Sequence, residues 1–501
     1  MLKKIVKKLC GFKGGIVGLF IAFQILVFIP ALQKPTPWSD DWGYIFYNNV
    51  VGRSIFQDTI ASGRPILGFA VESAYKYSFV TSNLIIIHVL ALFGLLLLQL
   101  EVYKKLLRNG FSDSLSILSS LTLILIPGFQ GYVYFLSCFP YPWACLLGFL
   151  SYDFLNGNKL KEKVAGCLLI IVSLLVYPAG AMFYFLSYFI EFIVRFKGET
   201  PILSNVRHLI GILAKFFSCL VLGALLAKIV LSIYGVKQAS RVEFVDSLPS
   251  LFDKAIWVVS RLFVSEFRIF TVSSPTAVRA AIESAFVFLL LVFFILKPHQ
   301  GFKLNRCLNF ALMLLVPLLG ALPNLFIREN QFEFRTLTAT YCMSLILWVY
   351  CFDQFLQNAN VSRQIIKSKA KTFWQKIIPL AWVPLVLLTA FQVQGDSKDL
   401  WVKPSLIRDE LTLKALKNSN FDLENSICMV IPDEIYAPLD KLGVYSMRSD
   451  LVSPWVPGPY LRLQLELLNK DFSKEVSVQR NPEDCNPKDN IIDYGPISNI
   501  P

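Results

Sequence analysis

Histidines, paired cysteines and glycine-rich phosphate loops are scarce or missing in this chain. Only 3 histidines occur among 501 residues and no Cys-x-x-Cys motif is present, which excludes the usual sequence patterns of zinc sites. Gly11, Gly14, Gly15 and Gly18 form no dinucleotide-binding motif, because no strand precedes them and the segment is apolar. We find neither a phosphate loop nor a domain that would bind a nucleotide sugar.

Long apolar runs are present instead. The chain is 55% hydrophobic with a mean hydropathy of +0.55. Apolar runs of roughly 17 to 25 residues recur along the first four fifths, and each can cross a bilayer. We predict an all-α polytopic membrane protein. About eleven spans are expected, with centres near residues 23, 93, 120, 143, 170, 188, 220, 286, 317, 346 and 385.

Charge divides the chain into two parts. Residues 395–501 contain 12 Lys+Arg and 17 Asp+Glu, whereas the preceding residues contain 36 basic and 18 acidic side chains. We therefore predict a transmembrane domain over residues 1–394 and a soluble C-terminal domain over residues 395–501. Membrane topology accounts for the basic charge, so no nucleic-acid partner is expected.

The distribution of Lys and Arg predicts the orientation. The N-terminal segment and the loops on its side hold far more Lys and Arg than the longer loops on the other side, which places the N-terminus in the cytoplasm. The C-terminal domain and the loop 34–82 then face outward. The apolar run after the first lysines is too long for a typical cleavable signal, so we expect an uncleaved first span. The predicted location is a bacterial inner membrane, multi-pass, with a periplasmic C-terminus.

Two outward segments look interfacial. Aromatic and apolar residues between Leu251 and Phe267 alternate with polar ones, which favours an amphipathic helix on the membrane surface. The stretch from Gly43 to Ile60 likewise predicts a short interfacial helix, because it is rich in tyrosine and phenylalanine.

The C-terminal domain is predicted to be a small periplasmic α/β module. Residues 427–432 are typical of a buried strand, residues 454–459 of a proline-rich loop, and residues 461–468 of a helix. Cys428 and Cys485 are the two cysteines of this domain, and they are a candidate disulfide if it lies in an oxidising compartment.

The candidate catalytic residues are two adjacent acids, Asp40 and Asp41, just beyond the first span. A carboxylate there can act as a general base toward a hydroxyl group, and two neighbouring carboxylates can share a cation. The same pair could also be solvated loop acids or could cap the following helix.

Two arginines follow in the same outer loop. Arg64 lies between Gly63 and Pro65, which predicts a fixed turn that would aim its guanidinium. Arg64, with Arg53 nearby, is a candidate for binding a lipid-linked phosphate. The alternative is an interfacial anchor that contacts lipid headgroups.

A third group of charges lies in a short outward turn, Arg328-Glu329-Asn330-Gln331-Phe332-Glu333-Phe334-Arg335. Charge at membrane depth is costly and tends to be paired or to face a cavity. Arg328, Glu329, Glu333 and Arg335 could form a second phosphate site, or they could be an ordinary ion-paired turn.

The chain resembles the GT-C class of membrane glycosyltransferases and, more narrowly, the bacterial serotype-converting glucosyltransferases that modify O-antigen. The resemblance rests on short motifs at matching places in the topology. They are Ser39-Asp40-Asp41-Trp42-Gly43, Gly63-Arg64-Pro65, Tyr177-Pro178 and the turn from Arg328 to Arg335. Members of the family often have Gln where this chain has Pro178, so no role is assigned to that turn.

The resemblance implies a polyprenyl-phosphate-linked sugar donor, often glucose, and transfer on the periplasmic face to a lipid-linked glycan or O-antigen. It also implies that Asp40 and Asp41 are the catalytic pair. Whether they bind a divalent cation, Mg²⁺ or Mn²⁺, stays open. The phosphate-binding roles of Arg64 and Arg335 are inferred from charge and position.

Other functions compatible with the sequence are a lipid-glycan flippase or transporter, an O-antigen polymerase and a membrane scaffold. A transporter is expected to have ionisable residues within its spans. A polymerase is expected to carry its key charges in a large later loop. The acidic pair directly after the first span favours the glycosyltransferase.

Overall fold

The computed structural model covers most of the predicted membrane domain and the centre of the C-terminal domain. It describes residues 14–35, 37, 40–46, 52, 54–77, 84–195, 201–239, 245, 247–265, 304–327, 334–361, 383–384, 386–395, 397–398, 402–417, 425–431, 457–468, 476–479 and 481–494. Arg53, Arg328, Glu329, Glu333 and the span expected near residue 286 lie outside the described residues. The side chain of Asp40 also lies outside them.

Several helices can cross a membrane. In the described part of the chain, 4 segments are long and apolar enough: α2 (Gly14–Gln33), α6 (Leu84–Arg108), α13 (Ile202–Tyr234) and Leu308–Phe326. The bent pair α7 (Asp113–Leu123) and α8 (Pro127–Tyr134), with 54° between its helices, would be a fifth. Pro127 begins α8, and a proline there interrupts the hydrogen bonds of a continuous helix.

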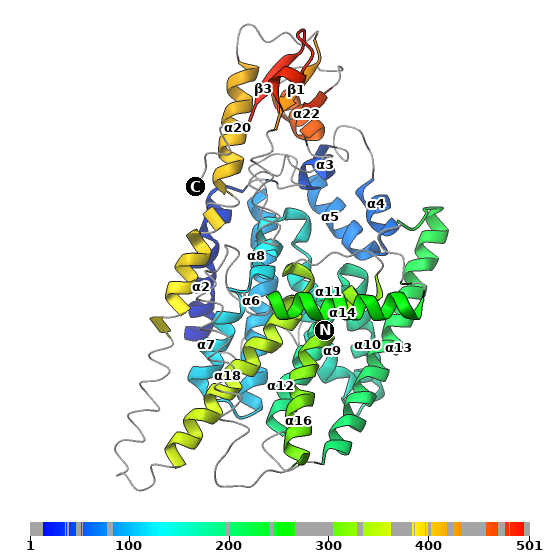
Figure 1. The fold of residues 1–501 in the computed structure, drawn as a ribbon, viewed down its shortest axis with the longest axis vertical. Helices are drawn as coiled ribbons and strands as arrows, with labels where there is room; N and C mark the ends of the chain where they lie inside the picture. The colour runs from blue at the N-terminus through cyan, green and yellow to red at the C-terminus, as the bar shows by residue number, and fades with distance from the viewer. Residues whose placement is uncertain are drawn as a thin grey trace.

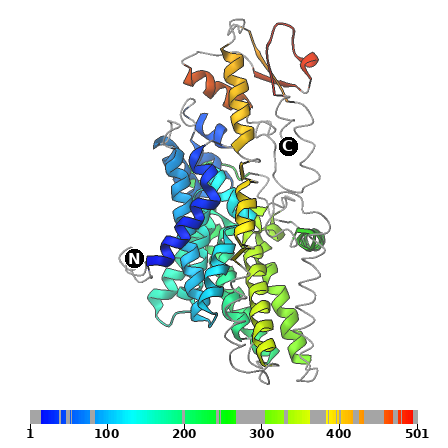
Figure 2. The same ribbon diagram turned by 90° about the vertical axis from the view of Figure 1, so that its left-hand side faces the viewer.

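Further helices of the bundle are α9 (Tyr141–Leu155), α10 (Leu160–Val176), α11 (Pro178–Ala181), α12 (Phe183–Arg195) and α18 (Thr338–Val361). The segment Leu308–Phe326 is itself made up of part of α16 (Leu304–Leu315), η6 (Val316–Ala321) and α17 (Leu322–Phe326). Most of these helices run beside the long helices, along the long axis of the molecule (Figures 1 and 2). The span centres expected near residues 143, 170 and 188 fall on helices, but the number of eleven spans stays a prediction.

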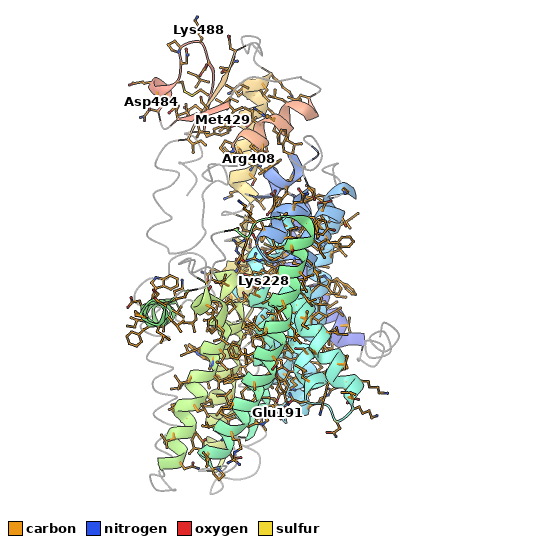
Figure 3. All side chains as sticks on the ribbon, turned by 90° about the vertical axis from the view of Figure 1, so that its right-hand side faces the viewer. Glu191, Lys228, Arg408, Met429, Asp484 and Lys488 are labelled. Atoms are coloured by element: carbon orange, nitrogen blue, oxygen red, sulfur yellow. A yellow bond between two sulfur atoms is a disulfide. The ribbon has the colours of Figure 1, made fainter. Side chains whose placement is uncertain are left out.

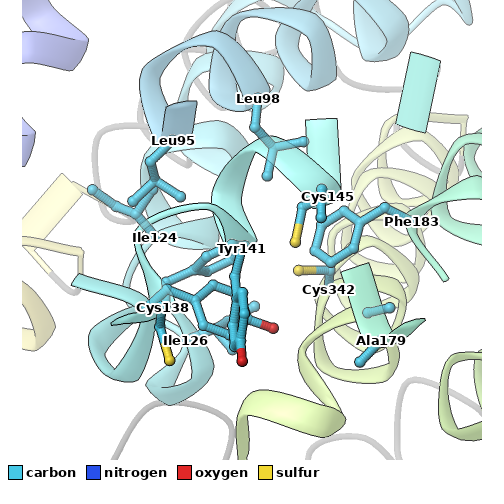
Figure 4. Close-up of a cluster of buried hydrophobic side chains, with 14 of the residues drawn as sticks. Leu95, Leu98, Ile124, Ile126, Cys138, Tyr141, Cys145, Ala179, Phe183 and Cys342 are labelled. Atoms are coloured by element: carbon cyan, nitrogen blue, oxygen red, sulfur yellow. The ribbon is translucent and has the colours of Figure 1, made fainter. Parts of the chain in front are cut away.

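The centre of the bundle is an aliphatic and aromatic core. Figure 4 shows Leu95, Ile124, Cys145, Phe183 and Cys342 close together, although they are far apart in the sequence, and all five are buried. Cys145 and Cys342 act here as small apolar side chains.

Small residues let α9 and α11 approach closely. A Cβ atom added at Gly148 would lie 2.7 Å from the carbonyl oxygen of Gly180. One added at Gly180 would lie 2.7 Å from Cβ of Ala144. Such contacts are typical of helix packing in membranes. They also bring together the residues that precede or begin these helices, Tyr141 and Tyr177, whose rings stack with centroids 3.8 Å apart.

The segment after α2 forms α3 (Asp40–Phe46), α4 (Ile55–Ala61) and α5 (Pro65–Tyr77), located between the bundle and the C-terminal domain (Figure 1). The prediction of one helix from Gly43 to Ile60 was wrong, because α3 ends at Phe46 and α4 begins at Ile55. Between them Gly52 has a φ of 72°, a left-handed conformation that no α-helix continues through.

The amphipathic segment is a helix, α14 (Leu248–Ser265), which crosses the bundle at a steep angle to α13 in Figure 1. Leu248, Phe252 and Ile256 are exposed on one face, while Lys254 and Val258 are buried on the other. The helix was therefore predicted correctly, and its place on a membrane surface stays a prediction.

The C-terminal domain contains a three-stranded parallel sheet of order β2-β1-β3 in the described residues. The strands are β1 (Ile427–Val430), β2 (Val476–Gln479) and β3 (Asn490–Asp493), with helices α20 (Lys403–Leu416) and α22 (Pro457–Leu467) beside them. Every residue of the central strand β1 is buried. This confirms the small α/β module and the predicted buried strand.

Cys428 and Cys485 form a disulfide, so the candidate pair is bonded. The proline-rich loop was placed too far along the chain, because Pro457 already begins α22. A proline in the first turn of a helix loses no hydrogen bond, since the first N–H groups have no partner within the helix.

Candidate functional site

Asp41 is a buried acceptor at the centre of the site. Its side chain is 0% exposed. Its Oδ1 accepts hydrogen bonds from the hydroxyl of Tyr75 at 2.8 Å and the backbone N–H of Ser137 at 2.9 Å, and its Oδ2 accepts one from the N–H of Leu136 at 3.0 Å. The carboxylate thus ties α3 to α5 and to η3 (Leu136–Cys138), which suits a positioning role better than proton abstraction from a bound substrate.

Tyr75 is an obligate donor in this arrangement. Burial, followed by the neighbouring Asp41 carboxylate, raises the pKa of Tyr75 well above its ordinary value. The hydroxyl therefore keeps its proton and donates to Asp41 throughout the physiological range. Asp40 precedes Asp41 and is the first residue of α3.

Arg64 lies in the tight turn between α4 and α5, as the sequence predicted. Gly63 has a φ of 73°, and the N–H of Arg64 donates to the carbonyl of Thr59 at 3.1 Å. The guanidinium carbon lies 5.5 Å from the ring centroid of Tyr177, within the range of a cation–π contact. Its Nε is buried and has no hydrogen-bond partner among the described residues.

Glu72 holds the α4–α5 turn together. Its carboxylate accepts from the Ser54 hydroxyl at 2.6 Å, from the N–H of Phe56 at 2.8 Å and from Lys76 Nζ at 3.0 Å. Burial alone would raise the pKa of Glu72, but these partners together lower it below its ordinary value of 4.5.

The lowered pKa predicts a pH dependence for this turn. A carboxylate whose pKa is depressed by folding contributes stability above its ordinary pKa and loses that contribution as pH falls below it. We expect Glu72→Gln to destabilise the protein by about 1 kcal/mol at pH 7, and the difference from wild type to shrink below pH 4.5. Thermal unfolding in detergent between pH 3.5 and 7 measures this. Glu101→Gln, which removes an i,i+3 pair with Lys104, is the control, and a difference constant with pH would contradict the prediction.

Arg335 lies beside residues 135–138, the segment that Asp41 contacts. It lies in η7 (Phe334–Thr336), its guanidinium carbon is 5.4 Å from the ring centroid of Phe135, and Nη1 is 3.9 Å from Sγ of Cys138. Its carbonyl accepts from the hydroxyl of Tyr132 at 2.6 Å. Arg335 is thus fixed against the end of α8.

The structure therefore brings three of the predicted site residues to one place. Asp41 and Arg335 both contact residues 135–138, and Arg64 contacts Tyr177, which stacks on Tyr141 at the start of α9. Sequence reasoning missed segment 135–141 as part of the site. Pro140 within the segment and Pro142 just after it were the available signal of a break between helices.

A mainly apolar cavity of about 380 Å³ adjoins Arg64. Residues 62–64, α10, the start of α11, α13 and α17 line it, and Leu174, Phe216, Leu220 and Phe326 belong to its apolar wall. This volume is within the usual range of small-molecule sites.

Lys228 of α13 lines the same cavity with an exposed side chain (Figure 3). The sequence reading did not select Lys228. A lysine within an apolar 33-residue helix is nevertheless a recognised sign of function. The cavity thus combines an apolar wall with two cations, the features that an anionic lipid requires.

No group of three or more His, Cys, Asp and Glu side chains suited to a metal ion occurs within the described ranges. Whether Asp40 and Asp41 bind a divalent cation stays a prediction. No known family model matches the chain, and no curated protein is significantly similar to it. The function is accordingly inferred from the geometry of the site and from its motifs.

Proposed function

We propose that this protein is a polytopic glycosyltransferase of the bacterial inner membrane. It would transfer a sugar, with glucose as the first candidate, from a polyprenyl-phosphate-linked donor to a lipid-linked glycan or O-antigen. One observation carries the proposal. The acidic helix α3 and two predicted phosphate-binding arginines, Arg64 and Arg335, meet around residues 135–141, beside an apolar cavity.

The cavity supports a polyprenyl-phosphate-linked sugar as the donor substrate. An apolar wall suits a polyprenyl chain, and Arg64 with Lys228 suits the phosphate that joins this chain to the sugar. The buried Nε of Arg64 has no partner among the described residues, and a buried donor without a partner costs free energy that a bound phosphate would recover.

The chemistry follows from these positions. The acceptor hydroxyl attacks the anomeric carbon, and Asp40 takes its proton as general base. The bond from the anomeric carbon to the phosphate oxygen breaks, and the polyprenyl phosphate leaves with the bonding electrons. Arg64 and Arg335 stabilise the negative charge of this leaving phosphate, and Asp41 positions α3.

The topology is part of the proposal. We propose about eleven spans in a GT-C-like arrangement, with a cytoplasmic N-terminus and the site and C-terminal domain in the periplasm. The disulfide Cys428–Cys485 supports this orientation, because disulfides persist in the periplasm and are rare in the cytosol.

Binding of polyprenyl phosphate tests the donor assignment directly. We expect purified full-length protein to bind undecaprenyl phosphate more tightly than uncharged undecaprenol. Arg64→Gln should weaken phosphate binding by about 10- to 100-fold, the loss expected for a hydrogen bond to a charged group. Lys228→Gln should weaken it less, since its side chain is exposed.

Lys215→Gln is the matched control, because Lys215 lies on the same helix but donates to Asn156 Oδ1 and does not line the cavity. Equal binding of the phosphate and the alcohol would contradict the proposal. Tight phosphate binding without any sugar transfer would instead favour the flippase.

A further inference from the structure

The C-terminal domain contacts the acidic helix itself. Trp42 directly follows the acidic pair in α3, and its side chain is buried. Its ring lies against that of Tyr460 on α22, with centroids 4.9 Å apart and an interplanar angle of 79°. This edge-to-face geometry is favourable for aromatic pairs. A residue next to the candidate catalytic acids is therefore packed by a helix more than 400 residues further along the chain.

A buried cation completes this contact. Arg408 of α20 is 0% exposed, and Figure 3 shows it where the C-terminal domain meets the membrane domain. Its guanidinium carbon lies 4.7 Å from the ring centroid of Trp42 and 4.5 Å from that of Tyr460. Cation–π contacts of this kind are strongest where water is excluded. We call Trp42, Arg408 and Tyr460 the aromatic clamp.

Hydrogen bonds fix the clamp within the C-terminal domain. Asp409 Oδ1 accepts from Arg408 Nε at 2.9 Å and from the hydroxyl of Tyr460 at 2.9 Å. The hydroxyl of Tyr460 also lies 2.9 Å from Thr412 Oγ1, which lies 2.9 Å from the hydroxyl of Tyr494 beyond β3. The network spans α20, α22 and the end of the sheet, so the position of Arg408 depends on the folded domain.

Helix α3 is consequently held from two sides. Asp41 connects it to α5 and η3 in the membrane domain, and Trp42 connects it to the C-terminal domain. The helix has 7 residues, too few to be stable without tertiary contacts. Its placement therefore depends on tertiary contacts such as these two attachments.

We propose that the C-terminal domain positions helix α3 of the catalytic centre. Arg408 is the positioning residue, and it acts on the acidic pair through Trp42. The effect on catalysis rests on the proposed function, whereas the attachment of α3 to the C-terminal domain does not. The attachment of α3 can be tested without any substrate.

Hydrogen exchange of the purified full-length protein tests the attachment. Arg408→Met keeps much of the side-chain volume but removes the charge, and we expect the amides of α3 to exchange about tenfold faster, the factor for a lost cation–π contact of ~1.4 kcal/mol. Arg408→Lys keeps a cation and should restore part of the protection. Arg462→Met, on an exposed position of α22, is the control and should change nothing in α3.

Trp42→Leu tests the clamp from the membrane side if Arg408→Met does not fold. It leaves Arg408, Asp409 and Tyr460 in place, and it should also speed exchange in α3, whereas Trp42→Phe should have a smaller effect. Unchanged exchange of α3 in Trp42→Leu, or in a folded Arg408→Met protein, would overturn the inference whatever the activity of the protein.

Kinetics test the catalytic consequence. A positioning role predicts that Arg408→Met lowers kcat for sugar transfer about tenfold per folded molecule, with little change in the KM for donor, and that Arg408→Lys recovers part of it. If exchange increases but kcat is unchanged, the clamp is structural and the positioning role is refuted. If Asp40→Asn is fully active, the proposed function fails while the exchange result still stands.

Discussion

Replacement of Asp40 by Asn is expected to reduce sugar transfer by about 10²- to 10⁴-fold, the usual contribution of a general base. The folded protein should remain in the membrane in normal amount, because the substitution keeps the shape of the side chain. The measurement is the sugar composition of the lipopolysaccharide glycan in cells that carry only the variant, together with the amount of protein in the membrane. The sugar that disappears would identify the donor.

Asp41→Asn should behave differently. Its carboxylate accepts hydrogen bonds from Tyr75, Leu136 and Ser137, and an amide NH₂ in place of one oxygen would face one or more of these donors. We expect a loss of about 1–3 kcal/mol of stability for the unpaired group, seen as less protein in the membrane, in addition to lower transfer. Asp253→Asn, an exposed acid on α14, is the control. An unchanged glycan in both Asp40→Asn and Asp41→Asn would mean that these acids only cap the loop and take no part in transfer. A transporter or a membrane scaffold would then be favoured.

Removal of the disulfide has the largest expected effect on stability. Cys428 and Cys485 are 57 residues apart, and closing a loop of this length stabilises a fold by about 4 kcal/mol in the chain-entropy model. The double substitution to Ala should therefore unfold the C-terminal domain at a lower denaturant concentration. Limited proteolysis across a urea series, with intact membranes, reports this through the protection of residues 403–494.

Cys342→Ala is the matched control, because Cys342 is a buried free cysteine in the bundle. Treatment of wild type with a reductant should reproduce the effect of the double variant. Since the aromatic clamp depends on the folded domain, loss of the disulfide should also speed hydrogen exchange in α3. Equal protease resistance of wild type and double variant would contradict the stabilising role.

Local sequence patterns predicted part of the site well. Gly63 and Pro65 indicated a fixed turn at Arg64, and the turn is formed with Gly63 in a left-handed conformation. Cys428 and Cys485, the two cysteines of one domain, were a candidate disulfide, and they are bonded. These features depend on a few neighbouring residues or on composition, which a sequence displays directly.

Other parts of the site depend on long-range contacts. Asp41 contacts residues 95 and 96 positions away, and Trp42 contacts Arg408 and Tyr460. No periodicity or motif indicates such pairs. Lys228 was missed for the same reason, because its importance depends on a cavity that five separate segments enclose.

The sequence by itself determined the helical class, the apolar helices able to cross a membrane and the small C-terminal α/β domain. Hydropathy, helix length and charge are properties of local segments, so they can be read without coordinates. The tertiary structure alone decided that Asp41 is buried, that Arg64 and Arg335 lie around residues 135–141, and that the C-terminal domain holds α3. These are results of packing, in which the close approach of α9 and α11 and the burial of aromatic rings select which distant residues meet.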